Sequence, residues 1–405
     1  MKRGIIKSLG QNEVFAFNII IEKDSYTISG FPIERSATNE EMLHLTKDAL
    51  RIFQEIERKI TDKKKLNISL DDKLFITPEE CHEYLIKLAG CGRDAYEQFF
   101  FDKYAKSEFS RLRAYQSTMQ FAPTIYSNSL IYPWEVLYEG DDYKNPKSDM
   151  FWGFHYPVSR ALAIKPILDR KFLLSLEMLF CLHQKLNYAH QQEQPELEKL
   201  IIKNKGKFYI LQVSKKIQRL NNGEELLEHF YQNQYNILHF ACHCRPCSKY
   251  EDEIDALIIS LQEDNNNQQI ELEVKNFNRV NGVFQCQPLI FLNACQSAGG
   301  VDELRKTFNL PNMFIKYGAA AVIATACPMP DVFAAAFAKV FYEFFIGKKM
   351  LIGKALCETR RYFLEKYNNP LGLAYGLYSP HDYQIAQIPA LQALAQSSKA
   401  PISIG

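Results

Sequence analysis

Asn236-Ile-Leu-His-Phe-Ala-Cys-His243 and Pro288-Leu-Ile-Phe-Leu-Asn-Ala-Cys295 are two short apolar stretches, and each ends in a side chain that can take part in chemistry. Apolar runs of this length are typical of strands buried on both faces, as in a parallel sheet. An α/β sheet presents its functional groups outside the carboxyl ends of its strands. The two stretches therefore predict an α/β fold with a histidine and a cysteine at the ends of nearby strands.

The chain from Phe172 onward alternates between strand-like and helix-like segments. This alternation predicts a mostly parallel central sheet that is flanked by helices on both faces. We expect strands at 172–182, 208–213, 237–241, 256–261, 288–295 and 319–325, and helices at 194–203, 223–232, 308–318, 332–345 and 353–367.

The N-terminal region has a different pattern. Residues 13–34 alternate in the β manner and predict a hairpin, and the segment that begins Ala37-Thr-Asn-Glu-Glu predicts a capped helix. Residues 65–70 have β character again. Thr77-Pro-Glu-Glu then predicts the start of a helix that runs to about residue 101, with an interruption at Gly90 or Gly92.

The composition gives no support to binding of nucleic acid, membranes or nucleotides. Lys and Arg number 48 against 47 Asp and Glu, so no overall charge favours nucleic acid or an anionic membrane as a direct partner. No glycine-rich phosphate loop occurs, and we expect no cofactor. The start lacks a signal-peptide core and no long uncharged apolar stretch follows, which predicts a cytoplasmic protein without a membrane partner. The ten scattered cysteines predict reduced thiols.

His243 and Cys295 suit a particular chemistry. The histidine precedes the cysteine by 52 residues (295 − 243), close to the interval of roughly 50 found in caspases. Cys295 would attack a peptide carbonyl, His243 would act as acid and base, and the backbone N–H groups of Cys295 and Cys244 could form the oxyanion hole. The two residues alone leave another interpretation open, namely a small core cysteine and a hydrogen-bonded loop histidine.

The surrounding sequence resembles a known family. The two opening stretches resemble the two signatures of CHAT domains, which are caspase-like cysteine peptidases of clan CD. The segment Tyr132-Pro-Trp-Glu-Val-Leu and the later Arg160 resemble another part of the family pattern, as does Ala374-Tyr-Gly-Leu-Tyr378. The resemblance covers about residues 65–387. Two departures are Cys244, where the family usually has glycine, and the segment Cys327-Pro-Met-Pro before Asp331, where it often has tryptophan.

The resemblance implies a domain organisation and a function. We expect a β-hairpin and helix appendage at 1–62, the N-terminal part of the CHAT region at 63–170, a catalytic core at 171–387 and a flexible tail at 388–405. The family implies a regulated bacterial protease that cleaves a specific protein partner, in several settings within antiviral defence or cell death. Because no repeats or sensor motif are visible, we expect activation by another protein, a small ligand or self-cleavage. The alternative is a caspase-like scaffold without catalysis.

The candidate residues for the specificity pocket are Asn293, Asp255 and Asp331. Some clan CD peptidases have an aspartate two residues before the nucleophile, where it holds a basic substrate side chain. This chain has the uncharged Asn293 there, so the position gives no support to a preference for Lys or Arg. Asp255 lies in an acidic loop, and an acid at a helix start, such as Asp331, is more often a cap.

A zinc site is a competing interpretation of the histidine region. Cys242, His243, Cys244 and Cys247, with His239 or Cys286, could provide four ligands. The spacing is not that of a standard zinc knuckle, and strand alternation sends Cys242 and His239 to opposite faces. We therefore expect no metal.

Overall fold

The computed structural model describes a large part of the chain and leaves several connections, and some side chains within strands, undescribed. The described residues are 14–21, 25–28, 31–34, 39–64, 66–100, 106–107, 110, 120–127, 132–161, 172–173, 175–183, 185–211, 223–246, 257–260, 272, 274–278, 284–294 and 310–386. The predicted tail at 388–405 lies outside them.

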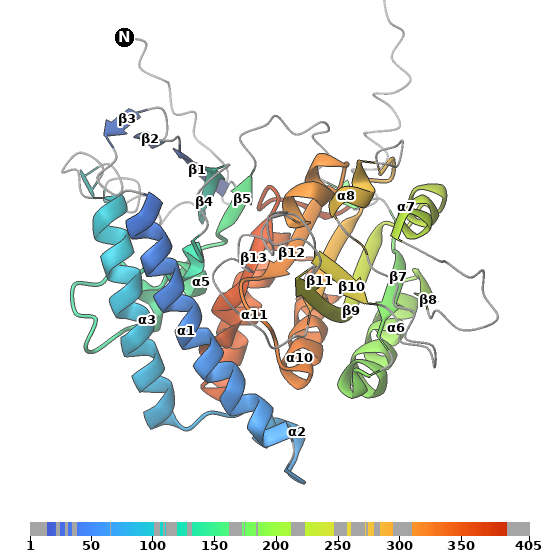
Figure 1. The fold of residues 1–405 in the computed structure, drawn as a ribbon, viewed down its shortest axis with the longest axis horizontal. Coiled ribbons are helices and arrows are strands. Elements are labelled where there is room, and N and C mark those ends of the chain that lie inside the picture. The colour runs from blue at the N-terminus through green and yellow to red at the C-terminus, as the bar shows by residue number, and fades with distance from the viewer. Residues whose placement is uncertain are drawn as a thin grey trace, which may run out of the picture.

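Within the described residues, twelve strands form one sheet that crosses the molecule (Figure 1). Its order is β3-β2-β1-β4-β5-β13-β12-β11-β9-β7-β8, and β10 pairs with β9 outside this path. Along the path from β13 to β8, β13 is antiparallel to β12 and the other pairs are parallel. The strands of this half are β7 (Glu177–Leu182), β8 (Lys207–Leu211), β9 (Ile237–Pro246), β10 (Leu257–Ser260), β11 (Leu289–Ala294), β12 (Ala321–Thr325) and β13 (Tyr375–Tyr378).

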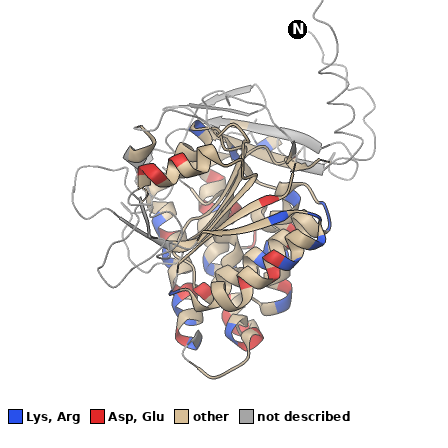
Figure 2. Cartoon of the chain, turned by 90° about the vertical axis from the view of Figure 1, so that its right-hand side faces the viewer, with Lys and Arg blue, Asp and Glu red and all other residues tan. Residues whose placement is uncertain are grey.

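Helices cover both faces of these strands (Figure 2), and two successive residues of β9 show which helices lie on which face. The ring of Phe240 meets Phe230 of α7 and Phe314, with centroids 5.7 and 6.0 Å apart. The ring of His239 meets Tyr342 of α10 at 5.7 Å. Because successive strand residues point to opposite faces, α7 and α10 lie on opposite sides of the sheet. The helices are α6 (Gln194–Lys203), α7 (Gly223–Gln232), α8 (Val274–Phe277), α10 (Asp331–Tyr342) and α11 (Ile352–Tyr367), and π-helical turns at Ala189–Glu193 and Glu343–Gly347 adjoin α6 and α10.

These observations confirm the predicted fold class, a mostly parallel α/β sheet with helices on both faces. The apolar strands form the centre of one large core, in which Ile290, Phe291 and Val322 are fully buried. Strand β10 shows a departure from the parallel pattern, since it pairs antiparallel with the last residues of β9.

The N-terminal hairpin is joined to the main sheet. Strands β1 and β2 pair antiparallel, and β1 also pairs parallel with β4, which continues through β5 to β13. Helices α1 and α3 lie side by side beneath these strands (Figure 1). The expected boundary at 62/63 falls in the last turn of α1. The bounds here are β1 (Val14–Ile21), β2 (Ser25–Ile28), β3 (Phe31–Glu34), α1 (Asn39–Lys64), α2 (Leu70–Leu74), α3 (Pro78–Phe99), β4 (Gln120–Ser127), α5 (Trp152–His155) and β5 (Ser159–Ala161). Short strands β6 (Phe172–Leu173) and β14 (Gln384–Ile385) pair separately.

Two local predictions around α2 and α3 were wrong. The expected strand at 65–70 is absent from the residues described there, and α2 begins after Ser69, whose hydroxyl accepts the N–H of Asp72 at 3.1 Å. A cap of this kind satisfies a free helical N–H, which the few apolar residues of the segment cannot outweigh. The expected interruption at Gly90 or Gly92 is also absent, because α3 is continuous. A Cβ at position 92 would lie 2.0 Å from the carbonyl oxygen of Val136, so Gly92 permits close packing instead.

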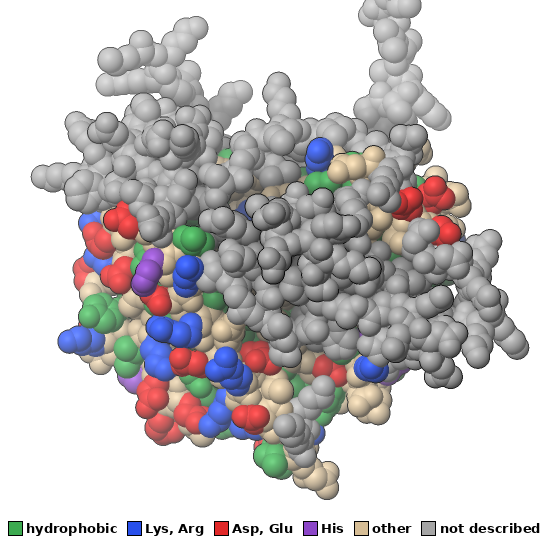
Figure 3. All heavy atoms as spheres, in the orientation of Figure 1, with side chains coloured by type: hydrophobic (Ala, Val, Ile, Leu, Met, Phe, Trp, Pro, Cys, Tyr) green, Lys and Arg blue, Asp and Glu red, His purple; other side chains and the backbone are tan. Residues whose placement is uncertain are grey.

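The surface of α1 and α3 mixes charges of both signs (Figure 3). Lys87 and Glu55 approach to 2.7 Å across the two helices, and Lys59 pairs with Glu80 nearby. Among the described helices, none is long and apolar enough to span a membrane.

Candidate active site

The strands of the two signature stretches are direct neighbours. Strands β9 and β11 are parallel, and their register pairs Asn293 with Ala241 and Ala294 with Cys242. In the sheet, β8 lies beside β7 on one side and β9 lies beside it on the other. Strand β11 is the next neighbour beyond β9. The carboxyl ends of β7 and β9 therefore flank the point where the direction of winding reverses, which is the usual place for a ligand site in such sheets.

His243 lies where the parallel part of β9 ends. The pairing of β9 with β7 ends at Ala241 and its pairing with β11 ends at Cys242. From His243 onward, β9 pairs antiparallel with β10, with Ser260 opposite His243 and Ile259 opposite Cys244. The backbones of His243 and Cys244 are thus part of a two-stranded ribbon at the carboxyl edge, while their side chains lie outside the described part. Cys295 and Asp255 also lie outside the described residues.

Asn293 is described, and its side chain is fully engaged within the protein. Only 1% of it is exposed. Its Nδ2 donates to Oε1 of Glu193 at 2.9 Å, and its Oδ1 accepts the hydroxyl of Tyr375 at 2.7 Å. The expected role of Asn293 in a specificity pocket stays a prediction, and these contacts give its amide an internal function.

Glu193 also meets the other signature strand. Its carboxylate is 1% exposed, and Oε1 lies 2.8 Å from Nε2 of His239, although the ring N–H is not aligned for a hydrogen bond. Nδ1 of His239 lies 3.2 Å from the hydroxyl of Tyr342. The imidazole is stacked between Phe180 of β7 and Phe291 of β11, with ring centroids 4.8 and 5.1 Å away. A single carboxylate oxygen thus contacts one side chain from β9 and one from β11.

Asp331 lies at the first residue of α10 and is also buried. Its Oδ2 accepts the backbone N–H of Tyr188 at 3.1 Å, at the start of the turn that ends in Glu193. Asp331 and Asn293 therefore contact the same short segment after β7, at its two ends. The assignment of Asp331 to a substrate pocket stays a prediction.

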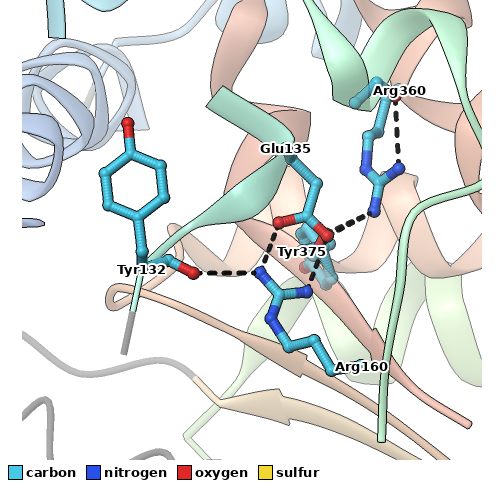
Figure 4. Close-up of polar contacts among 6 residues, drawn as sticks. Tyr132, Glu135, Arg160, Arg360 and Tyr375 are labelled. Atoms are coloured by element: carbon cyan, nitrogen blue, oxygen red, sulfur yellow. Dashed lines mark hydrogen bonds and ion pairs between the residues drawn. The ribbon is translucent and has the colours of Figure 1, made fainter. Parts of the chain in front are cut away.

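A second buried polar cluster lies farther along the sheet and joins the Pro-Trp-Glu segment to the core (Figure 4). We call Glu135, Arg160 and Arg360 the arginine cluster. Glu135 receives a two-pronged contact from Arg160, with Nη1 at 2.7 Å from Oε1, and Nη2 of Arg360 lies 3.2 Å from the same oxygen. Arg360 also donates to the carbonyl oxygens of Tyr375 and Gly153 at 2.7 and 3.2 Å.

The arginine cluster holds two cations against one carboxylate. Burial alone would lower the pKa of Arg160. The charge of Glu135 and its hydrogen bonds to Arg160 outweigh burial, so the pKa of Arg160 is raised. For Arg360 burial outweighs the attraction of Glu135, so its pKa is lowered from the ordinary value. Both side chains remain charged, since guanidinium is not deprotonated in proteins. The cluster therefore depends on Glu135 for its neutralisation.

His239 and Cys286, two candidate ligands of the zinc interpretation, have described side chains. Nδ1 of His239 lies 3.2 Å from the hydroxyl of Tyr342, and Nε2 lies 2.8 Å from Oε1 of Glu193. The thiol of Cys286 donates to the carbonyl oxygen of Tyr235 at 2.9 Å. Within the part of the chain that the structure describes, no group of three metal-capable residues occurs.

Sequence reasoning missed most of the buried residues near the site. Glu193 lies in the polar run His190-Gln-Gln-Glu193, which gives no sign of burial. His239 has metal-ligand chemistry in the sequence, but its contact with Glu193 becomes visible only in the structure. The useful signal was its position in β9, four residues before His243 and thus on the same side of an alternating strand.

The comparisons with known proteins agree with the signatures. The family model of the CHAT domain matches residues 51–386. A curated protein from Vitiosangium sp., named a probable protease, is 33% identical over 89 residues, and the match covers 22% of this chain and 11% of that protein. The chain thus spans about a tenth of the length of this relative.

Two solved structures are similar to the described fold at low sequence identity. The separase–securin complex of Saccharomyces cerevisiae matches with a TM-score of 0.38 and 15% identity, over 85% of this chain and 22% of that one. The Arg-specific cysteine proteinase gingipain R (RgpB), from Porphyromonas gingivalis, matches with a TM-score of 0.45 and 9% identity, over 83% and 76%.

Proposed function

We propose, for a chain that belongs to the CHAT-domain family, that it is a cysteine endopeptidase with Cys295 as nucleophile and His243 as acid and base. The observation that carries the proposal is the register of β9 and β11, in which Ala294 lies opposite Cys242. His243 follows Cys242 in the sequence, and Cys295 follows Ala294. Parallel strands lie about 4.8 Å apart and successive Cα atoms about 3.8 Å, so covalent geometry alone keeps the two Cα atoms within about 12 Å.

The chemistry assigned to the pair follows from their side chains. The Cys295 thiolate attacks the scissile carbonyl carbon, and the resulting oxyanion accepts hydrogen bonds from the N–H groups of Cys295 and Cys244. His243 gives a proton to the departing amine, which leaves an acyl-enzyme. Water, deprotonated by His243, then releases the acid and restores the thiol.

The substrate in this proposal is a specific protein partner. The setting is a regulated protease of bacterial defence or cell death that acts in the cytoplasm, with an activating protein or small ligand. The relative from Vitiosangium sp., named a probable protease, supports a proteolytic role. The competing proposal is a scaffold without catalysis, and the presence of both His243 and Cys295, each following a paired residue of β9 or β11, counts against it.

An electrophilic peptide probe tests the proposal. Wild-type protein, Cys295→Ala and His243→Ala are treated with peptidyl acyloxymethyl ketones that carry different side chains at the reacting residue, and adducts are located by peptide mapping. We expect an adduct at Cys295 that His243→Ala strongly reduces. Labelling at Cys247 instead, unchanged in His243→Ala, would overturn the assignment.

A further inference from the structure

A chain of buried polar contacts joins the two signature strands just before their proposed catalytic residues. We call Glu193, His239 and Asn293 the strand clamp. Glu193 Oε1 lies 2.8 Å from His239 of β9 and 2.9 Å from Asn293 of β11. All three side chains are at most 1% exposed. The clamp thus consists of one carboxylate held between neighbouring strands, away from solvent.

Side chains from two further elements fix the orientation of the clamp. Burial, with the charge of Glu193 adding to it, holds the pKa of Tyr342 well above its usual range. Its phenol therefore keeps its proton, and the hydroxyl lies 3.2 Å from Nδ1 of His239, so the ring is held with Nε2 on the side of Glu193. The hydroxyl of Tyr375 donates to Oδ1 of Asn293, so the amide is oriented with its Nδ2 toward the carboxylate.

The position of the clamp relates it to the proposed reaction. Asn293 precedes Cys295 by two residues, and His239 precedes His243 by four. Between them, the register pairs Asn293 with Ala241. A change in the clamp therefore alters the relative position of the strand ends, on which the alignment of thiol and imidazole depends. Misplacement by about 1 Å can cost on the order of a hundredfold in rate.

We propose that Glu193 and Asn293 are positioning residues that align Cys295 with His243 by clamping β11 to β9. The inference rests on the proposed function. It assigns Asn293 a role inside the fold in place of contact with a substrate side chain. A role in folding stability alone is the competing explanation.

A charge swap separates these explanations. Asn293→Asp places a second carboxylate against Glu193, which repels it and breaks the clamp. Combining Asn293→Asp with Glu193→Gln leaves a single carboxylate and restores the contact between the two positions, because the amide introduced in place of the Glu193 carboxylate can donate to the aspartate. Thr124→Val is the matched control, since Thr124 and Ser159 form a buried contact of 2.9 Å between β4 and β5, outside the signature strands.

The measured quantity is the rate constant of iodoacetamide alkylation at Cys295 from pH 5 to 10, followed by peptide mapping, with thermal unfolding of each variant in parallel. A thiol aligned with imidazole reacts below the ordinary cysteine pKa of about 8.5. The midpoint of the curve of rate constant against pH reports the pKa of the Cys295 thiol. In Asn293→Asp we expect this midpoint to rise by about one pH unit, which lowers the rate constant tenfold at pH values below the midpoint. The double variant should return the midpoint to the wild-type value, and Thr124→Val should leave it unchanged.

The outcomes separate the two proposals. If wild-type Cys295 titrates like a free thiol and His243→Ala changes nothing, the dyad itself is refuted and the inference falls with it. If the wild-type midpoint is low and depends on His243, but Asn293→Asp lowers only the unfolding temperature, the dyad stands and the positioning role is refuted. If the double variant remains as impaired as Asn293→Asp, the paired role of Glu193 is refuted.

Discussion

The arginine cluster and the strand clamp are both built on a buried glutamate, yet they differ in charge and in what they connect. Glu135 is the shared counter-charge of two guanidinium groups and ties the Pro-Trp-Glu segment to α11 and β13. Glu193 meets an imidazole and an amide and ties β9 to β11. Tyr375 contacts both clusters. Its carbonyl oxygen accepts a hydrogen bond from Arg360, and its hydroxyl donates one to Asn293. The comparison suggests that the first cluster serves stability and the second serves alignment.

Loss of the carboxylate in the arginine cluster should have the largest effect on stability. Glu135→Ala leaves two buried cations without a counter-charge, and removal of one partner from a buried pair costs about 3–5 kcal/mol. We expect the free energy of unfolding, measured in urea, to fall by that amount. Glu55→Ala is the control, because its exposed pair with Lys87 contributes about 1 kcal/mol or less. Equal losses in the two variants would contradict the account.

Removal of one cation should cost less than removal of the carboxylate. Arg360→Met leaves Glu135 paired with Arg160, so the loss is mainly that of the hydrogen bonds to Gly153 and Tyr375, about 2 kcal/mol. Urea unfolding beside Glu135→Ala provides the measurement. A larger loss in Arg360→Met than in Glu135→Ala would show that the excess positive charge left by Glu135→Ala is not the main cost.

Loss of one hydrogen bond at the strand clamp should lower the free energy of unfolding less than the changes in the arginine cluster. Tyr342→Phe removes one neutral hydrogen bond to His239 and should lower the free energy of unfolding by about 1 kcal/mol. Its ring contacts with Phe291 would remain. Thermal unfolding and Cys295 alkylation on the same sample give the comparison. A stability loss as large as that of Glu135→Ala would remove the distinction between the clusters.

Buried thiols should contribute least to any labelling experiment. Burial raises the pKa of Cys81 to about 11, and it raises that of Cys357, which several nearby charges also influence, to about 11. Burial also raises the pKa of Cys181 and Cys327 far above the usual range. The protonated form therefore dominates at pH 8, and native protein should show no alkylation at these four sites within the time that modifies Cys295. Prompt modification of any of them would indicate local opening of the core.

The sequence was sufficient for much of the fold and for little of the site's surroundings. Periodicity gave α6 and α7 with the bounds that the structure shows, because each carries its own apolar stripe and a turn signal at its ends. The antiparallel pairing of β10 could not be predicted, since it depends on where β9 loses its parallel neighbours. The clamp was equally hidden, because Glu193 and Asn293 lie 100 residues apart and meet only after the sheet has formed.

The central claim is that His243 and Cys295 face each other across the ends of β9 and β11, and an engineered disulfide tests it most directly. His243→Cys is prepared in a background with Cys244→Ser and Cys247→Ser, oxidised mildly and mapped by mass spectrometry. A disulfide requires Cα atoms within about 7 Å. The account predicts a 243–295 disulfide as the main product. A thiol at position 243 that stays free while the protein remains folded would contradict it.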